Sequence, residues 1–154
     1  MDKTICFLHI MTNDEHNISM EYPVIKKQLY CYERLISLEY EIGAMHNNKY
    51  IIKQKDDYGI EPRCFILKQE LSNSKRIDPE ELILKLQKIL NNINIIVCNN
   101  AQFTLNTLLA EAIRYNIKLE FNKFIIIDIK EITKIEHTIL ETIKKNFFDL
   151  YNNI

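Results

Sequence analysis

The sequence has little glycine, little proline and no tryptophan. Its 154 residues include two glycines and three prolines, and no stretch is rich in glycine, proline or serine. A flexible linker between domains is therefore not expected. A chain of this length is enough for one domain and too short for two ordinary ones. We expect a single domain that spans residues 1–154.

Long apolar runs and an excess of one charge are also missing. The longest uncharged apolar run falls well short of the roughly 20 residues that cross a membrane, and the first residues do not resemble a secretion signal. These absences predict a soluble, intracellular protein in the cytoplasm, with no membrane partner. The formal net charge of −1 excludes a histone-like polycation. Binding of nucleic acid would therefore depend on a local patch of charge.

The cysteines are few and far apart. Cys6, Cys31, Cys64 and Cys98 form neither a C-x-x-C pair nor the Cys/His spacing of a zinc site. Cys6 and Cys98 lie inside apolar runs, which is typical of buried, reduced thiols. Neither a disulfide framework nor a structural metal is needed to hold a domain of this size together.

What the sequence does contain is a regular succession of apolar patterns. Alternating or continuous apolar residues predict strands, and apolar residues three and four apart predict helices. Asp78 followed by Pro79 and two glutamates is a strong helix start, and Asn47-Asn48 is suited to a tight turn. The predicted strands are 5–11, 36–43, 49–55, 93–98 and 124–127, and the predicted helices are 79–90, 101–115 and 135–151.

The order of these elements predicts an α/β fold. Three antiparallel strands followed by βαβ crossovers imply a mixed sheet covered by helices, the general plan of an RNase H-like domain. Other α/β folds accommodate the same order. Residues from about 13 to 35 fit none of the strands or helices, and we interpret them as an insertion.

Four segments resemble one family of enzymes. Residues 99–105 read N-N-A-Q-F-T-L and resemble the second motif, H-N-A-x-F-D-L, of the DEDDh 3′–5′ exonucleases, the proofreading exonuclease family of DNA polymerases. Residues 41–45 (E-I-G-A-M) are similar to the family's second strand. Residues 7–12 lie over its first motif, F-L-D-I-E-T, and residues 137–142 over its third, H-x-A-x-x-D. The resemblance implies an RNase H-like fold.

The positions of the family's metal ligands carry other residue types. The family needs four carboxylates to hold two divalent ions, which orient the attacking water and stabilise the leaving oxygen. A thioether and hydroxyls are poor ligands for Mg²⁺ or Mn²⁺, and the family's general-base histidine alone has a counterpart, His137. The four ligand positions here are His9, Met11, Thr104 and Thr142.

The resemblance therefore implies an inactive enzyme. We expect no catalytic residue, no metal and no other cofactor. The domain would be a pseudo-exonuclease that acts as a protein-interaction or regulatory module, through a protein partner or self-association. Heavy use of isoleucine and asparagine suggests an AT-rich genome, and that of a large DNA virus, a phage or a bacterium would fit.

Two alternatives remain. In one, the chain is an active exonuclease that binds Mg²⁺ or Mn²⁺ through relocated carboxylates, for which Asp14, Glu15 and Glu141 are the candidates. Asp128, which follows the last strand, is predicted instead to cap a helix.

In the other alternative, the chain binds single-stranded nucleic acid without cleaving it. The positions that the resemblance assigns to nucleic-acid binding are Asn100, Phe103 and His137.

Overall fold

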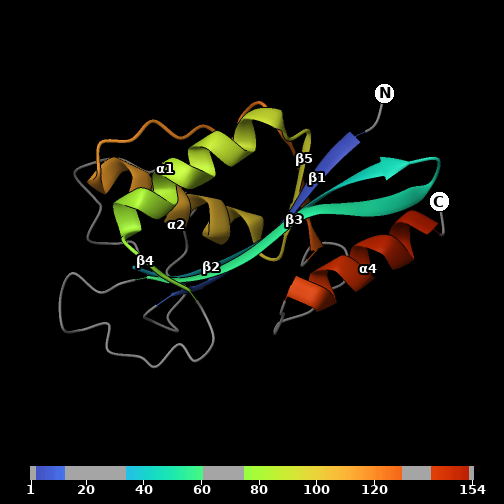
Figure 1. Ribbon diagram of the computed structural model, residues 1–154, viewed down its shortest axis with the longest axis horizontal. Coiled ribbons are helices and arrows are strands. Elements are labelled where there is room, and N and C mark those ends of the chain that lie inside the picture. Colours follow the sequence, from blue (N-terminus) through green and yellow to red (C-terminus); the bar gives the residue numbers. More distant parts are fainter. Residues whose placement is uncertain (1–2, 13–33, 61–74, 130–139, 153–154) are drawn as a thin grey trace.

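The structure is a computed structural model that describes residues 3–12, 34–60, 75–129 and 140–152 (Figure 1). The predicted insertion lies outside these residues except for its last two positions. His137, Asp14, Glu15, Cys31 and Cys64 also lie outside them. The elements in chain order are β1 (Lys3–Thr12), β2 (Leu35–His46), β3 (Lys49–Ile60), β4 (Lys75–Ile77), α1 (Pro79–Ile89), the 3₁₀ helix η3 (Leu90–Asn92), β5 (Ile95–Cys98), α2 (Ala101–Arg114), β6 (Ile125–Asp128) and α4 (Leu140–Asn152).

The strands form one mixed sheet in the order β4-β3-β2-β1-β5-β6. The neighbours β1–β2 and β2–β3 are antiparallel, whereas β1–β5, β5–β6 and β3–β4 are parallel. The predicted α/β fold, with three antiparallel strands and then parallel crossovers, is confirmed at this level. The three-residue strand β4 was not predicted, because so short a segment shows no periodicity.

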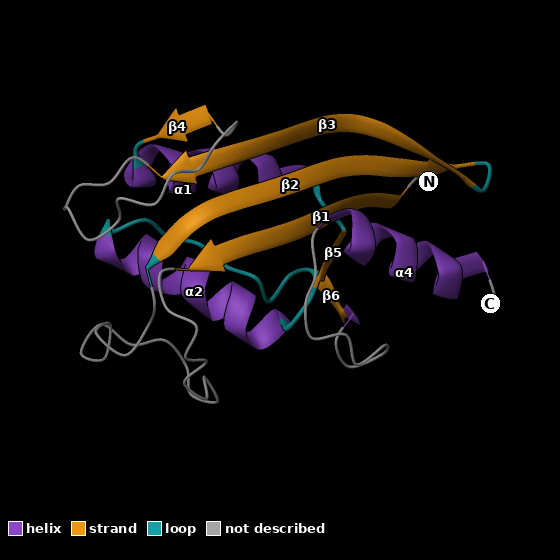
Figure 2. Cartoon of the chain, turned by 90° about the horizontal axis from the view of Figure 1, so that it is seen from below, coloured by secondary structure: helices purple, strands orange, loops and turns teal. Residues whose placement is uncertain are grey.

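Helices cover both faces of the sheet (Figures 1 and 2). In β1, Cys6 and Leu8 point into a core under α1 and α2, and Ile5 and Phe7 point into a second core under α4. The side chains of β1 and β5 are therefore buried on both faces. This double burial explains why these two strands read as continuous apolar runs rather than as alternating ones.

Local signals in the sequence set the predicted helix start and turn. The Asp78 carboxylate accepts a hydrogen bond from the Glu81 N–H at 3.4 Å, and Pro79 occupies the first turn of α1. Asn47 and Asn48 have φ values of 52° and 63°, so they form the left-handed turn between β2 and β3. Asparagine adopts this backbone conformation more readily than most residues.

The largest departures from the sequence patterns are in β3 and β6. β3 runs through Gly59 to Ile60 instead of ending near residue 55, because it pairs with β2 over almost its whole length. β6 is an apolar run that is not buried like β1 and β5: it lies at the edge of the sheet, and Ile125 is 58% exposed. An apolar run does not by itself tell an edge strand from a central one, because the order of strands in the sheet decides this.

Cys6 and Cys98 are buried and unbridged, as predicted. Burial raises the pKa of the Cys6 thiol to about 12. Burial, and then the nearby charge of Asp128, raise the pKa of Cys98 as well. Both thiols therefore remain protonated at neutral pH, and a protonated thiol is a poor nucleophile and a poor metal ligand.

Candidate functional site

The carboxyl ends of three parallel strands meet at one end of the sheet. β1, β5 and β6 are neighbours and run in the same direction. Asn99 and Asn100 follow β5, and Asp128 is the last residue of β6. His9 and Met11 lie near the end of β1. Open α/β sheets commonly bind their ligands at this end, so we take it as the candidate site.

Asp128 caps helix α2, as predicted. Its Oδ1 accepts a hydrogen bond from the Asn100 N–H and its Oδ2 accepts one from the Ala101 N–H, both at 2.9 Å. Asn100 has a left-handed backbone, and its own side chain makes no capping bond. The carboxylate of the neighbouring strand therefore satisfies the free N–H groups and stabilises the positive end of the helix.

We expect Asp128→Ala to lower the free energy of unfolding by about 1–2 kcal/mol, because two N–H groups lose their acceptor. Urea denaturation followed by circular dichroism measures the change. Asp149→Ala removes an exposed carboxylate of α4 and is the control, with an expected change below about 0.5 kcal/mol. Equal losses in the two variants would contradict a capping role.

The residues that match the family's second motif hold the junction between β5 and α2. Thr104 is 4% exposed, and its hydroxyl donates a hydrogen bond to the Asn99 carbonyl at 3.1 Å. Phe103 is partly buried and packs against the core under α1 and α2. The Asn100 N–H is bound to Asp128. Each of these three residues is therefore held in place, Thr104 and Asn100 by hydrogen bonds that involve the main chain and Phe103 by packing in the core.

His9, Met11 and Thr142 belong to the α4 side of the sheet. Alternation along β1 places His9 and Met11 on the same face as Phe7, which packs against α4. His9 is half-buried and pairs with Glu39 of β2, whereas Met11 is 48% exposed. Thr142 lies in the first turn of α4 and is half-buried. Thr104 lies in the first turn of α2, a helix that covers the opposite face but begins just after the carboxyl end of β5.

Acidic side chains are close to His9, but they are not arranged as a metal site. Burial, and next the negative charge of Asp57, raise the pKa of Glu39. In the part of the chain that the structure describes, no three His, Cys, Asp or Glu side chains are grouped so as to hold a metal ion.

Further along the same face, lysines neutralise two carboxylates. Glu41 is fully buried. Its Oε2 accepts a hydrogen bond from the Tyr50 hydroxyl at 2.8 Å and forms an ion pair with Lys144 Nζ at 2.7 Å. Its Oε1 lies 3.8 Å from Lys55 Nζ and has no hydrogen-bond partner. Glu141 pairs with Lys55 at 2.9 Å, and this hydrogen bond lowers the pKa of Glu141. Glu141, a candidate for a relocated ligand, is thus part of an ion-pair network between α4 and the sheet.

A hollow of about 430 Å³ lies beside this network, between the β2–β3 turn and α4. Tyr50 and Phe148 form apolar parts of its wall, and Lys144, Lys145 and Asn48 form polar parts. This hollow is near the start of β3 and not at the carboxyl end of β1. It could not be predicted from local patterns, because its walls come from the β2–β3 hairpin and from α4, which lie far apart in the sequence.

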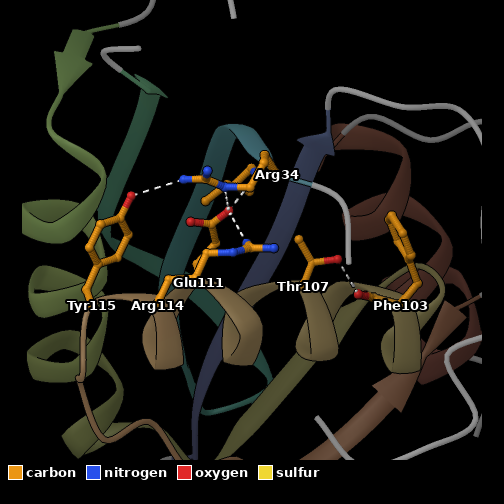
Figure 3. Close-up of polar contacts among 7 residues, drawn as sticks. Arg34, Phe103, Thr107, Glu111, Arg114 and Tyr115 are labelled. Atoms are coloured by element: carbon orange, nitrogen blue, oxygen red, sulfur yellow. Dashed lines mark hydrogen bonds and ion pairs between the residues drawn. The ribbon is translucent and has the colours of Figure 1, made fainter. Parts of the chain in front are cut away.

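A buried ion-pair cluster lies on the α2 side of the sheet (Figure 3). The sequence patterns did not predict it. Glu111 of α2 is 1% exposed, and its Oε1 accepts hydrogen bonds from Arg34 Nε and Arg114 Nη1, both at 2.9 Å, and from the Leu35 N–H at 3.0 Å. Arg34 Nη2 also donates to the Tyr115 hydroxyl at 3.1 Å. The cluster fixes the point where β2 begins. One signal was present: Glu111 follows the buried Leu108 by three positions, which places a carboxylate on the apolar face of the helix.

Comparison with known proteins finds neither a family model nor a curated protein that matches this chain. Within the described residues, no helix is long and apolar enough to cross a membrane. The side chains at the carboxyl ends of β1, β5 and β6 are therefore the basis for a functional proposal.

Proposed function

We propose that this chain is a catalytically inactive exonuclease-like domain that acts by binding a protein, as an interaction or regulatory module in nucleic-acid metabolism. One observation carries the proposal: the polar side chain at the ligand position of the second motif, and the carboxylate of Asp128 beside that motif, bind the main chain. The Thr104 hydroxyl binds the Asn99 carbonyl, and Asp128 caps α2. In an exonuclease the position of Thr104 carries a carboxylate that must face the metal ions.

The sheet supports an RNase H-like assignment. The antiparallel strands β3, β2 and β1 are followed outward by the parallel strands β5 and β6, each reached through a helical crossover. This is the arrangement that the resemblance implies. A fold can persist after its catalytic groups are lost, because apolar patterning specifies the strands and helices.

The chemistry at the end of β1 supports protein binding better than hydrolysis. Hard cations such as Mg²⁺ prefer oxygen ligands, so the thioether of Met11 cannot replace a carboxylate. Its side chain is 48% exposed. Exposed methionines are flexible and polarizable, and protein surfaces that bind partners use them for this reason.

The test is a nuclease assay on the native chain. End-labelled single-stranded DNA and RNA are incubated with the purified protein and Mn²⁺, and we expect no shortening above a blank without protein. Degradation that requires Mn²⁺ and disappears in Glu141→Ala would establish the relocated-ligand alternative instead. Tight binding of the labelled strand that weakens steeply with added salt would favour the nucleic-acid-binding alternative.

Restoring the carboxylates gives the complementary measurement. The variant His9→Asp, Met11→Glu, Thr104→Asp, Thr142→Asp is expected to bind Mn²⁺ in isothermal titration calorimetry, whereas the native chain is not. The control variant carries the other three substitutions without Thr104→Asp, and it should bind Mn²⁺ more weakly. Circular dichroism establishes that each variant is folded. Mn²⁺ binding by the native chain that equals that of the restored variant would contradict the proposal.

A further inference from the structure

In the described part of the chain, most of one edge of the sheet has no partner strand. β4 pairs with β3 only at Tyr58–Ile60. Residues 49–57 of β3 therefore have β2 on one side and no strand of the described chain on the other (Figure 2). N–H and C=O groups on the outer side of such a stretch are free to pair with another strand.

The side chains of this edge combine apolar and basic character. Ile51 and Ile52 are 51% and 52% exposed, and they point to opposite faces of the sheet. Lys49, Lys53 and Lys55 surround them, and the pairing with β2 shifts register beside Gly43. Edge lysines and bulges prevent indiscriminate strand pairing. A partner that pairs with this edge must therefore bring negative charge next to the lysines.

The charges along β3 are divided between its two halves. The lysines occupy residues 49–55, and Asp56 and Asp57 follow directly. Parallel stacking of two such edges would bring lysine beside lysine. Antiparallel pairing centred on Lys53 places Lys49 of each copy opposite Asp57 of the other, so a two-fold axis makes this favourable contact twice, against one contact of Lys53 with its own copy. Lys55 and Asp56 already form ion pairs within the chain. The edge is therefore complementary to a second copy of itself.

We propose that two copies of this chain associate through antiparallel pairing of their β3 edges, which joins two sheets into one. This inference rests on the proposed function, in which the chain acts by binding a protein, and identifies that protein as a second copy of the chain. The two proposals fail separately. A monomer without nuclease activity refutes only the pairing, and Mn²⁺-dependent degradation by a dimer refutes only the proposed function.

Sedimentation equilibrium of the full chain over a range of concentrations tests the pairing. We expect a monomer–dimer equilibrium, and we expect Ile52→Asp to weaken it by at least about tenfold, because the substitution buries a charge in the new strand pair. Ile125→Asp is the matched control, since Ile125 is similarly exposed at the opposite edge of the sheet. A monomer at all concentrations, or a dimer weakened by Ile125→Asp and not by Ile52→Asp, would overturn the proposal.

A charge exchange tests the antiparallel orientation. Lys49→Asp and Asp57→Lys should each weaken self-association, because each places like charges beside one another. An equimolar mixture of the two variants should recover dimers, since the basic edge of one variant then meets the acidic edge of the other. The recovered dimer should also weaken at high salt. A mixture that stays monomeric would show that the strands do not pair in this orientation.

Discussion

Replacing Glu111 with alanine is expected to lower the free energy of unfolding by about 3–5 kcal/mol, the usual cost of removing one partner from a buried ion pair. The carboxylate is 1% exposed and accepts hydrogen bonds from three donors. Without it, the Leu35 N–H loses its acceptor, and the Arg114 side chain, which is only 16% exposed, loses the carboxylate 2.9 Å from its Nη1. Urea denaturation at neutral pH measures the loss.

Glu120→Ala is the matched control for this prediction. Glu120 also pairs with a cation, Lys118 at 3.4 Å, but the two side chains are 54% and 81% exposed. An exposed pair of this kind contributes at most about 1 kcal/mol. Glu111→Gln, which keeps the side-chain shape and one carbonyl acceptor, should lie between the two. If Glu111→Ala costs no more than Glu120→Ala, the cluster does not anchor the start of β2.

The parts of the fold that were predicted correctly depend on neighbours in the sequence. The start of α1 follows from Asp78 and Pro79, and the β2–β3 turn follows from Asn47 and Asn48. Here the side chain or backbone that determines the structure lies within a few residues of the feature. The Glu111 cluster was not predicted, because Arg34 lies 77 positions away in the sequence. A pattern of neighbouring residues does not indicate an ion-pair partner that lies so far away in the sequence.

The same distinction separates the predicted and unpredicted parts of the candidate site. The capping role of Asp128 was predicted from its place after the last strand, where the family that the chain resembles has a non-catalytic aspartate, and from the attraction of carboxylates to helix N-termini. The exposure of β6 could not, because it depends on which strand ends the sheet. Glu41 was noticed through the resemblance, but its partners Lys55 and Lys144 come from β3 and α4. Tertiary packing alone brings these charges together.

Removing Glu41 is expected to lower the free energy of unfolding as much as removing Glu111 does. A double substitution can show how much of this loss comes from charge. Glu41→Ala should lower the free energy of unfolding by about 3–5 kcal/mol, because the 15% exposed Lys144 loses its closest anionic partner and the Tyr50 hydroxyl loses its acceptor. Much of that loss is the penalty for a nearly buried charge whose remaining carboxylate, that of Glu141, lies 3.9 Å away. It should therefore shrink when that charge is removed as well.

The double variant Glu41→Leu, Lys144→Met replaces the pair with apolar side chains and leaves the Lys55–Glu141 pair in place. It should recover at least about half of the stability lost in Glu41→Ala, since buried ion pairs often exchange for apolar residues at little cost. Lys145→Met, an exposed neighbour on α4, is the control and should change stability by less than about 0.5 kcal/mol. A double variant as unstable as Glu41→Ala would mean that shape, and not charge compensation, determines how α4 packs on the sheet.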